Sequence, residues 1–267
     1  MRGALAAMLQ RPIASAESDH YLRQILARES VLSGLLSPAN QASAALTPVI
    51  RAWGGHHVSY VALSGSFAKG TANRSTSDLD LFISLHSWCE IPLRDICMSL
   101  RDRLRASNLS ATFQNASVGT KIGTLNVDLV PARQHAGWGN DHSIYNKRTG
   151  SWRKTNVQTH VRVVSSSERL SEIRLLKVWR DQHGLEFPSF LLELSVIRAL
   201  SDDWYGTLSS RFIKVLDYLA NGFESSQIVD PANPSNVISD DLSHGEKVRI
   251  QDSARRCLTY TWVGIVR

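Results

Sequence analysis

Two aspartates, Asp78 and Asp80, stand two residues apart at the start of a predicted strand with the sequence DLDLFISL. Side chains two apart on a strand project from the same face, so the two carboxylates repel each other unless a cation lies between them. Magnesium is a hard ion that takes oxygen ligands, commonly one or two protein carboxylates together with substrate phosphates. The pair therefore predicts a divalent-metal site, although an isolated Asp-x-Asp is more often a solvated turn or cap.

Gly65 and Ser66 precede this pair in LSGSFAKGTANRSTSDLDLFI, at the end of a strand predicted over residues 58–65. Glycine lets backbone amides come close to a phosphate, and Ser66 adds a hydroxyl where a short helix should begin. The N-terminus of a helix favours an anion. We interpret Gly65 and Ser66 as a phosphate-binding turn, against the alternative that an isolated Gly-Ser is only a loop.

A third carboxylate, Asp128, lies on a strand predicted over residues 123–130. Leu125, Val127 and Leu129 share one face of that strand, while Asn126 and Asp128 share the other. A third carboxylate would complete a second metal site and could help to deprotonate an attacking hydroxyl. The order strand, Gly-Ser, Asp-x-Asp, strand, Asp predicts two Mg²⁺ or Mn²⁺ ions that clamp the attacking and leaving oxygens of a phosphoryl transfer.

This arrangement resembles the shared pattern of the DNA polymerase beta-like nucleotidyltransferases. The form GSFAKGTANRSTSDLDL is similar to the branch with oligoadenylate synthase, cyclic GMP–AMP synthase and the bacterial cyclic-oligonucleotide synthases, the CD-NTases. The later segments RLLKVWRDQHG, PSFLLELSVIRAL and DPANPSNVISDDLS are similar to the helical half of the bacterial enzymes. The resemblance implies an α+β fold: a polymerase beta-like core with a mixed sheet and helices, a C-terminal helical lobe, and an active site in the cleft.

The resemblance also implies two further nucleotide-binding residues. Lys177 would reach the triphosphate of the donor nucleotide, and Ser189 in the PSF turn would hydrogen-bond to it. A lysine suits polyphosphate, and Ser189 stands at a predicted helix start next to a proline. The alternative for Lys177 is a solvated helix face.

Several other polar and aromatic residues keep two interpretations each. Lys69 and Arg74 would bind phosphate or a nucleic-acid backbone, or lie on the surface. Tyr145 and Trp152 flank the basic segment NKRTGSWRK and would stack on bases or pack at a lobe junction. Glu193, within an apolar helix, is expected to cap or pair internally without a catalytic role.

The periodicity of the apolar residues predicts the elements that position these side chains. We expect a catalytic core with N-terminal helices in residues 1–165 and a helical, oligoadenylate synthase-like lobe in residues 166–267. Helices are predicted over residues 19–36, 38–53, 91–106, 169–184, 187–200, 207–219 and 245–261, a further strand over 110–115, and a turn-dense connection over 230–236.

Composition agrees with a folded protein of the cytoplasm. Of 267 residues, 43% are hydrophobic and 20% charged, well away from the signature of disorder. Three scattered cysteines form neither a disulfide framework nor a zinc pair. Because no apolar run approaches roughly 18 residues, we expect no membrane partner, and the N-terminal apolar stretch is a weak match to a signal peptide. The net charge of +6 suits a phosphate-rich partner, but solubility explains it equally well.

We therefore expect an enzyme that transfers a nucleotidyl group from a nucleoside triphosphate to a hydroxyl and releases pyrophosphate. Its favoured product is a cyclic or linear oligonucleotide that signals to a downstream effector, as in antiphage defence. Nucleic acid is expected as an activator or as the acceptor. The alternatives are a nucleotidyltransferase that modifies tRNA or another RNA, as a toxin would, and a non-catalytic nucleotide-sensing protein.

Overall fold

The computed structural model describes residues 12–32, 34, 37–76, 78–137 and 139–267. Its larger sheet has seven strands, with β2 and β5 parallel and every other pair antiparallel. The predicted α+β fold with a mixed sheet is confirmed. The strand order is β1 (Val58–Ser64), β2 (Leu79–Leu85), β5 (Leu125–Gln134), β4 (Val118–Ile122) and β3 (Thr112–Phe113); β6 (His142–Asn146) pairs with β5, and β7 (Ser151–Thr155) pairs with β6.

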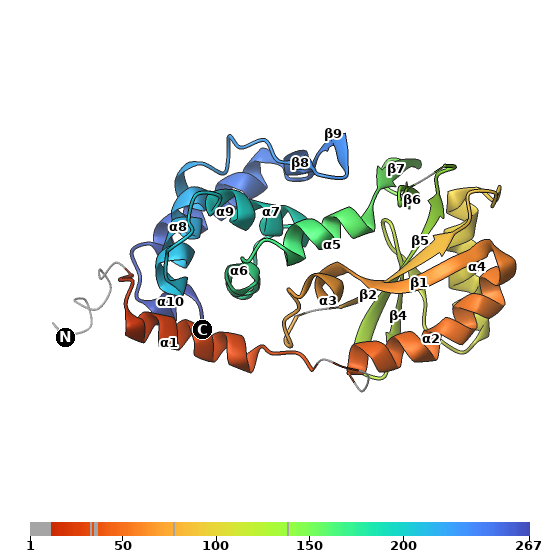
Figure 1. The fold of residues 1–267 in the computed structure, drawn as a ribbon, viewed down its shortest axis with the longest axis horizontal. Coiled ribbons are helices and arrows are strands. Elements are labelled where there is room, and N and C mark those ends of the chain that lie inside the picture. Colours follow the sequence, from red (N-terminus) through yellow and green to blue (C-terminus); the bar gives the residue numbers. More distant parts are fainter. Residues whose placement is uncertain (1–11, 33, 35–36, 77, 138) are drawn as a thin grey trace.

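The two faces of the sheet have different neighbours, because successive side chains of a strand point to opposite sides. Leu81, Ile83 and Leu129 pack in an apolar core with α2 (Pro38–Gly54) and α4 (Leu93–Ala106). Asp80 and Phe82 alternate with Leu81 and Ile83 along β2 and therefore point to the opposite face of the sheet. Near that second face lie the short helix α3 (Gly65–Lys69) and α5 (Val157–Ser165), between the sheet and the helical lobe (Figure 1).

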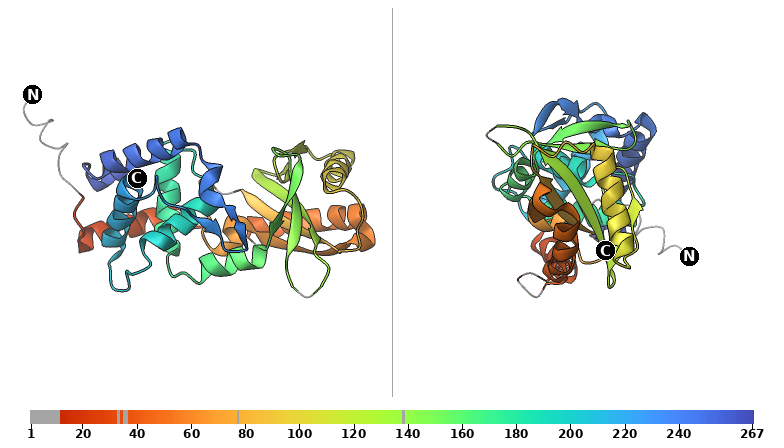
Figure 2. Two further views of the ribbon diagram at one scale, coloured as in Figure 1. Left: turned by 90° about the horizontal axis from the view of Figure 1, so that it is seen from above. Right: turned by 90° about the vertical axis from the view of Figure 1, so that its right-hand side faces the viewer.

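The helical lobe has a core of its own around Trp179, which is fully buried and donates its indole N–H to Cys257 Sγ at 3.3 Å. The two lobes lie side by side when viewed from above (Figure 2). No helix in the described part of the chain is both long and apolar enough to cross a membrane. The lobe contains α6 (Leu170–Gln182), α7 (Ser189–Ala199), α8 (Leu208–Asn221), the hairpin of β8 (Val229–Asp230) and β9 (Asn233–Val237), the 3₁₀ turn η3 (Ile238–Asp241), α9 (His244–Cys257) and α10 (Trp262–Ile265).

The first helix, α1 (Ala16–Arg28), belongs to the helical lobe by its contacts. Leu22 and Ile25 lie in the core of that lobe, and the Asp19 carboxylate accepts a hydrogen bond of 2.8 Å from the backbone N–H of Ser209 in α8. The sequence-based division placed the N-terminal helices with residues 1–165. In the structure the apolar stripe of α1 packs on α6 and α8, whereas that of α2 packs in the core beside the sheet.

The same helix ends at Arg28, eight residues before the predicted end at residue 36. Glu29 follows it and turns to the connection between α3 and β2, where its Oε2 accepts hydrogen bonds from the backbone N–H and the hydroxyl of Ser75 at 3.1 and 2.7 Å. Leu32 is exposed, and residues 33, 35 and 36 lie outside the described residues, as does the N-terminal stretch 1–11. The contacts of Glu29 with Ser75 of the other lobe therefore end the helix, although the apolar residues beyond Arg28 keep helical spacing.

Candidate active site

The structure places Asp80 and Asp128 next to each other on parallel strands. Asp80 of β2 is in register with Asp128 of β5 on one side and with Ser64 of β1 on the other. Asp78 lies just before β2, and its Oδ1 accepts a hydrogen bond of 3.1 Å from the side chain of Asn126. All three predicted carboxylates thus stand at one end of the β2–β5 pair.

The electrostatics of this group show that its negative charges repel one another. The pKa of Asp80 is raised to about 6, chiefly by burial and also by the charges of Asp128 and Asp78, against the opposing effect of Lys69 and Lys177. Burial, followed by the charge of Asp78, also raises the pKa of Asp128. A cation at this place would relieve the repulsion.

The donor set fits Mg²⁺ or Mn²⁺, because it consists of carboxylate oxygens, two of them at partly buried positions and that of Asp78 exposed. Among the described residues no three His, Cys, Asp or Glu side chains form a ready-made metal cage. Magnesium is usually held by one or two carboxylates and completed by substrate phosphates. Asp78, Asp80 and Asp128 are the residues that would hold such ions once a triphosphate supplies the remaining ligands.

Gly65 lies directly against the Asp80 carboxylate. Its φ is +56°, a value that favours glycine, and a Cβ at this position would overlap the Asp80 side chain. Gly65 begins α3 and Ser66 follows, its carbonyl accepting a hydrogen bond of 2.9 Å from the N–H of Thr71. The glycine is thus needed for its contact with a carboxylate, in addition to the approach to phosphate predicted from the sequence.

Replacing Gly65 with Ala should disrupt the site without unfolding the protein. We expect a loss of activity of about a hundredfold or more, because a shift of about 1 Å in a catalytic group costs on that order. Gly184→Ala is the matched control, with a φ of +58° and nothing within 4 Å of the added Cβ. If Gly65→Ala and Gly184→Ala lost the same activity, the loss would be due to backbone strain and not to the contact of residue 65 with Asp80.

Lys177 does not lie on a solvated helix face. It is 2% exposed, and its ammonium donates to Glu193 Oε1 at 2.7 Å and to Thr71 Oγ1 at 2.9 Å. Lys69 is likewise buried, not a surface charge, and donates to Glu193 Oε2 at 2.8 Å. Thr71 completes the network by donating its hydroxyl to Glu193 at 2.8 Å. Glu193 therefore pairs internally, with two lysines at once.

Ser189 is exposed at the first residue of α7, where its hydroxyl accepts a hydrogen bond of 2.9 Å from Arg180. The same Arg180 nitrogen donates to the carbonyl of Phe187 at 3.1 Å, which holds the turn before α7. The role of Ser189 toward the triphosphate stays a prediction. Arg180 is thus a cationic side chain at the turn before α7, and no sequence motif indicated it.

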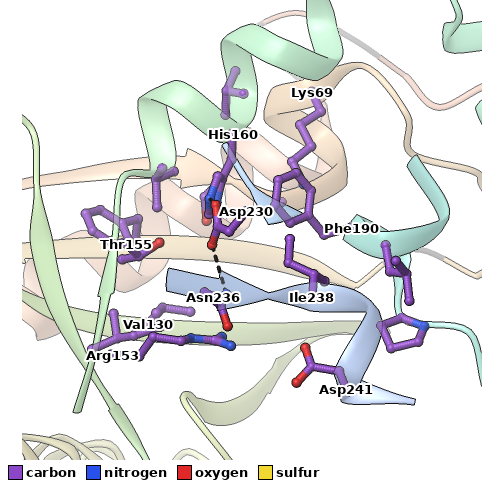
Figure 3. Close-up of a pocket in the computed structure, with 18 residues that line it drawn as sticks. Lys69, Val130, Arg153, Thr155, His160, Phe190, Asp230, Asn236, Ile238 and Asp241 are labelled. Carbon is purple, nitrogen blue, oxygen red and sulfur yellow. Dashed lines mark hydrogen bonds and ion pairs between the residues drawn. The ribbon is translucent and has the colours of Figure 1, made fainter. Parts of the chain in front are cut away.

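A cavity of about 320 Å³ lies between the sheet and the helical lobe (Figure 3), and Ser64 and Gly65 are among the residues that line it. Phe82 and Phe190 supply aromatic surface from the two sides, and Arg153 of β7 reaches into it. This volume lies at the lower end of the range typical of small-molecule pockets. No motif in the sequence indicates this role for the three residues, because only the fold brings β2, β7 and α7 together.

His160 of α5 closes one side of this cavity together with the β8–β9 hairpin. Its Nε2 lies 2.7 Å from Asp230 Oδ1, and its ring lies 4.3 Å from that of Phe190, centroid to centroid. Burial raises the pKa of Asp230, but hydrogen bonds from His160, Ala232 and Asn236 outweigh that effect and lower it overall. The segment expected to be only a turn-dense connection is thus a hairpin fixed to the cavity wall.

Tyr145 and Trp152 face each other across the β6–β7 pair and do not line the cavity. The Tyr145 ring stacks on Phe113 with 5.9 Å between centroids, and Trp152 is 60% exposed. Packing explains Tyr145. Of the basic stretch 146–154, Arg153 is the residue that lines the cavity.

Comparisons with known proteins agree with this geometry. Residues 49–137 match the family described as a nucleotidyltransferase domain. The cyclic AMP-AMP-AMP synthase of Escherichia coli (strain MS 115-1) is 24% identical over 217 residues, covering 66% of this chain and 67% of that protein.

Solved structures match the whole fold. E. coli MS115-1 CdnC in complex with HORMA-deltaN has a TM-score of 0.71 at 23% identity, covering 90% of each chain. The CD-NTase CdnG of Bradyrhizobium diazoefficiens, solved with GTP, has a TM-score of 0.74 at 15% identity, covering 92% of this chain and 89% of that one. The Cid1 poly(U) polymerase bound to MgATP has a TM-score of 0.64 at 14% identity, covering 91% and 93%. Residues 49–137 therefore match a nucleotidyltransferase domain, and the chain has the two-lobed fold of the bacterial CD-NTases.

Proposed function

We propose that the protein joins nucleoside triphosphates into a short cyclic or linear oligonucleotide that signals to a downstream effector in antiphage defence. The observation that carries this proposal is the register of Asp80 with Asp128, together with the contact between Asp80 and Gly65, which is one of the residues that line the cavity. The similarity to a cyclic AMP-AMP-AMP synthase supports an oligonucleotide product. The cavity at the interface of the lobes supports a bound nucleoside.

In this proposal the chain positions the reactants and supplies charge. Two Mg²⁺ or Mn²⁺ ions, when bound at Asp78, Asp80 and Asp128, would neutralise the triphosphate and clamp the attacking and leaving oxygens. The phosphates lie at the turn of Gly65 and Ser66, and the nucleoside extends from there into the cavity. In this proposal Asp128 also accepts the proton of the attacking hydroxyl as a general base.

A nucleotidyltransferase that extends RNA is the second candidate. The fold shared with a poly(U) polymerase favours it, and the net charge of +6 suits a nucleic-acid acceptor or activator. A protein activator is a further class of partner to test, since CdnC was solved in complex with HORMA-deltaN.

One incubation series separates these functions. The purified protein is incubated with each labelled ribo- and deoxyribonucleoside triphosphate and with Mg²⁺ or Mn²⁺, with and without tRNA, and the products are separated. We expect a short oligonucleotide that is absent with the Asp78→Ala variant. Resistance of this product to phosphatase identifies a ring, and sensitivity identifies a linear chain.

The other outcomes decide against the leading proposal. Label that moves only into tRNA would establish the RNA-directed activity. Binding of nucleotide without any product, with nucleic acid and metal present, would favour the non-catalytic nucleotide-sensing protein. An oligonucleotide still formed by the Asp78→Ala variant would remove the two-metal assignment.

A further inference from the structure

Arg153 lines the cavity with its hydrogen-bond donors unused. An arginine guanidinium has five N–H donors and no acceptor. Within the part of the chain that the structure describes, Arg153 makes neither a hydrogen bond nor an ion pair, although its side chain is half-buried. The next residue of β7, Lys154, is in contrast paired with Asp141 at 2.6 Å. The donors of Arg153 are therefore available to a ligand in the cavity.

Asp230 and Asp241 both line the cavity, but they differ in the acceptors that they leave free. Asp230 accepts hydrogen bonds from the Ala232 N–H at 2.9 Å and from the Asn236 amide at 3.1 Å, besides its contact with the histidine of α5. No described residue donates a hydrogen bond to the Asp241 side chain, whose ion pair is a 3.7 Å contact with the exposed Arg148. Asp241 is thus the carboxylate that a ligand can use.

The two unused groups face the same part of the cavity from different lobes. Arg153 belongs to β7 of the sheet, and Asp241 ends the turn η3 of the helical lobe. In Figure 3 both lie away from Lys69, and the guanidinium of Arg153 points toward Asn236 and Asp241. A ligand that enters between the lobes would therefore meet donors from one lobe and an acceptor from the other.

The other walls of the cavity suit a flat ring. Phe82 and Phe190 supply aromatic surface, and Val130, Ile144 and Ile238 supply aliphatic surface. Aromatic side chains stack on any nucleobase without regard to its sequence of donors and acceptors. The choice between bases must therefore come from the polar groups at the edge of the ring.

Guanine matches these polar groups better than the other common bases. It has two adjacent acceptors, O6 and N7, and two adjacent donors, N1–H and the 2-amino group. A guanidinium binds two adjacent acceptors with its planar fork, and a carboxylate accepts from two adjacent donors. Adenine places its 6-amino donor beside N7, uracil separates its acceptors by a donor, and cytosine has one amino group in place of two donors.

From this arrangement we infer that the protein takes a guanine nucleotide in the cavity, with Arg153 on O6 and N7 and Asp241 on N1–H and the 2-amino group. The inference rests on the proposed function and names the base, which the sequence motifs leave open. Arg153 and Asp241 contact the base and not the reacting atoms, so they determine specificity and take no part in the chemical step.

Calorimetric titration with the α,β-methylene triphosphates of guanosine, adenosine, cytidine and uridine in the presence of Mg²⁺ measures the choice of base. We expect the guanosine compound to bind about tenfold to a hundredfold more tightly than the other three, the range for a bidentate contact to a base edge. The 7-deazaguanosine compound lacks N7 and the inosine compound lacks the 2-amino group. Each should bind about threefold to tenfold more weakly than the guanosine compound.

Four variants assign the two contacts. Arg153→Met should no longer distinguish guanosine from 7-deazaguanosine, and Asp241→Ala should no longer distinguish guanosine from inosine, because the contact in question is already lost. Lys154→Met removes one positive charge from the same strand, and Asp240→Ala removes one negative charge next to Asp241. Neither Lys154 nor Asp240 lines the cavity, so both of these variants should keep the preference for guanosine.

Every other result decides against a named part of the inference. Equal binding of the four bases, or tighter binding of another base, would overturn it and leave the proposed function standing, since the protein would still bind triphosphates. An Arg153→Met protein that still requires N7 would remove Arg153 from the contact. If Arg153→Met does not fold, Arg153→Lys keeps the charge without the planar fork and gives the same readout. Failure to bind any of the triphosphates would remove the proposed function itself.

Discussion

Replacing Asp80 with Asn should abolish nucleotidyl transfer and at the same time stabilise the metal-free protein. Asp80 lies between Asp128 and Gly65. In the proposed mechanism the loss of its charge removes a ligand of the metal ions, which supply several kcal/mol of transition-state stabilisation. At about 1.36 kcal/mol for each tenfold change in rate, we expect activity to fall by about a thousandfold or more. The product assay described above measures this loss.

The gain in stability follows from the raised pKa of Asp80. That pKa is about 6 in the folded protein, against an ordinary value of 3.8. The folded state therefore binds more protons than the unfolded state between these values, so the charged carboxylate costs stability as the pH rises from about 4 to above 6. The cost is on the order of 2 kcal/mol. In a chelating buffer at pH 8, Asp80→Asn should show a higher free energy of unfolding, and the difference should vanish below about pH 4.

A surface replacement controls for the change of charge. Asp202→Asn alters an exposed residue in the connection between α7 and α8 and should change neither activity nor stability. Mg²⁺ with nucleotide should raise the melting temperature of the unchanged protein more than that of Asp80→Asn, because only the former binds the ions tightly. A variant that is less stable than the unchanged protein in the chelating buffer would contradict the repulsion among the three carboxylates.

The strands and helices that carry the three carboxylates could be predicted because each has a local signal. The alternation in LNVDLV predicts that Asp128 and Val127 point to opposite faces of the strand. In the structure Val127 is buried and Asp128 is half-buried. Residues 38–53 and 91–106 correspond closely to α2 and α4. Periodicity of apolar residues is a local property, and it is strong in these segments.

The rest of the site depends on contacts between residues far apart in the sequence. Lys69 and Glu193 are 124 positions apart, and nothing in the spacing of either predicts their ion pair. Helix α5 and the strands β6 and β7 were not predicted, and they bring His160 and Arg153 to the cavity. Tertiary packing also ends α1 at Arg28 despite the leucines beyond it.

The pairing of Lys69 and Lys177 with Glu193 leads to the second large expected effect. Glu193→Gln keeps the size of the side chain but leaves two buried ammonium groups without a counter-charge. Breaking a buried ion pair by removing one partner costs about 3–5 kcal/mol. For a chain of this size that corresponds to a fall in melting temperature of very roughly 6–20 °C, at about 2–4 °C per kcal/mol. Urea or thermal unfolding followed by circular dichroism measures it.

Three comparisons make this expectation specific to the lysines. Glu186→Gln, at an exposed carboxylate in the turn before α7, should leave stability unchanged. The double variant Glu193→Gln with Lys177→Met should regain part of the loss, because only one buried cation remains.

The defect of Glu193→Gln should also shrink in alkaline buffer. Burial lowers the pKa of Lys177 from its ordinary 10.5 even with Glu193 present, and without that carboxylate the pKa should fall further. The folded state then binds fewer protons than the unfolded state below about pH 10.5, so stability rises with pH over that window. A loss that is independent of pH, or one below about 1 kcal/mol, would show that Glu193 serves packing alone.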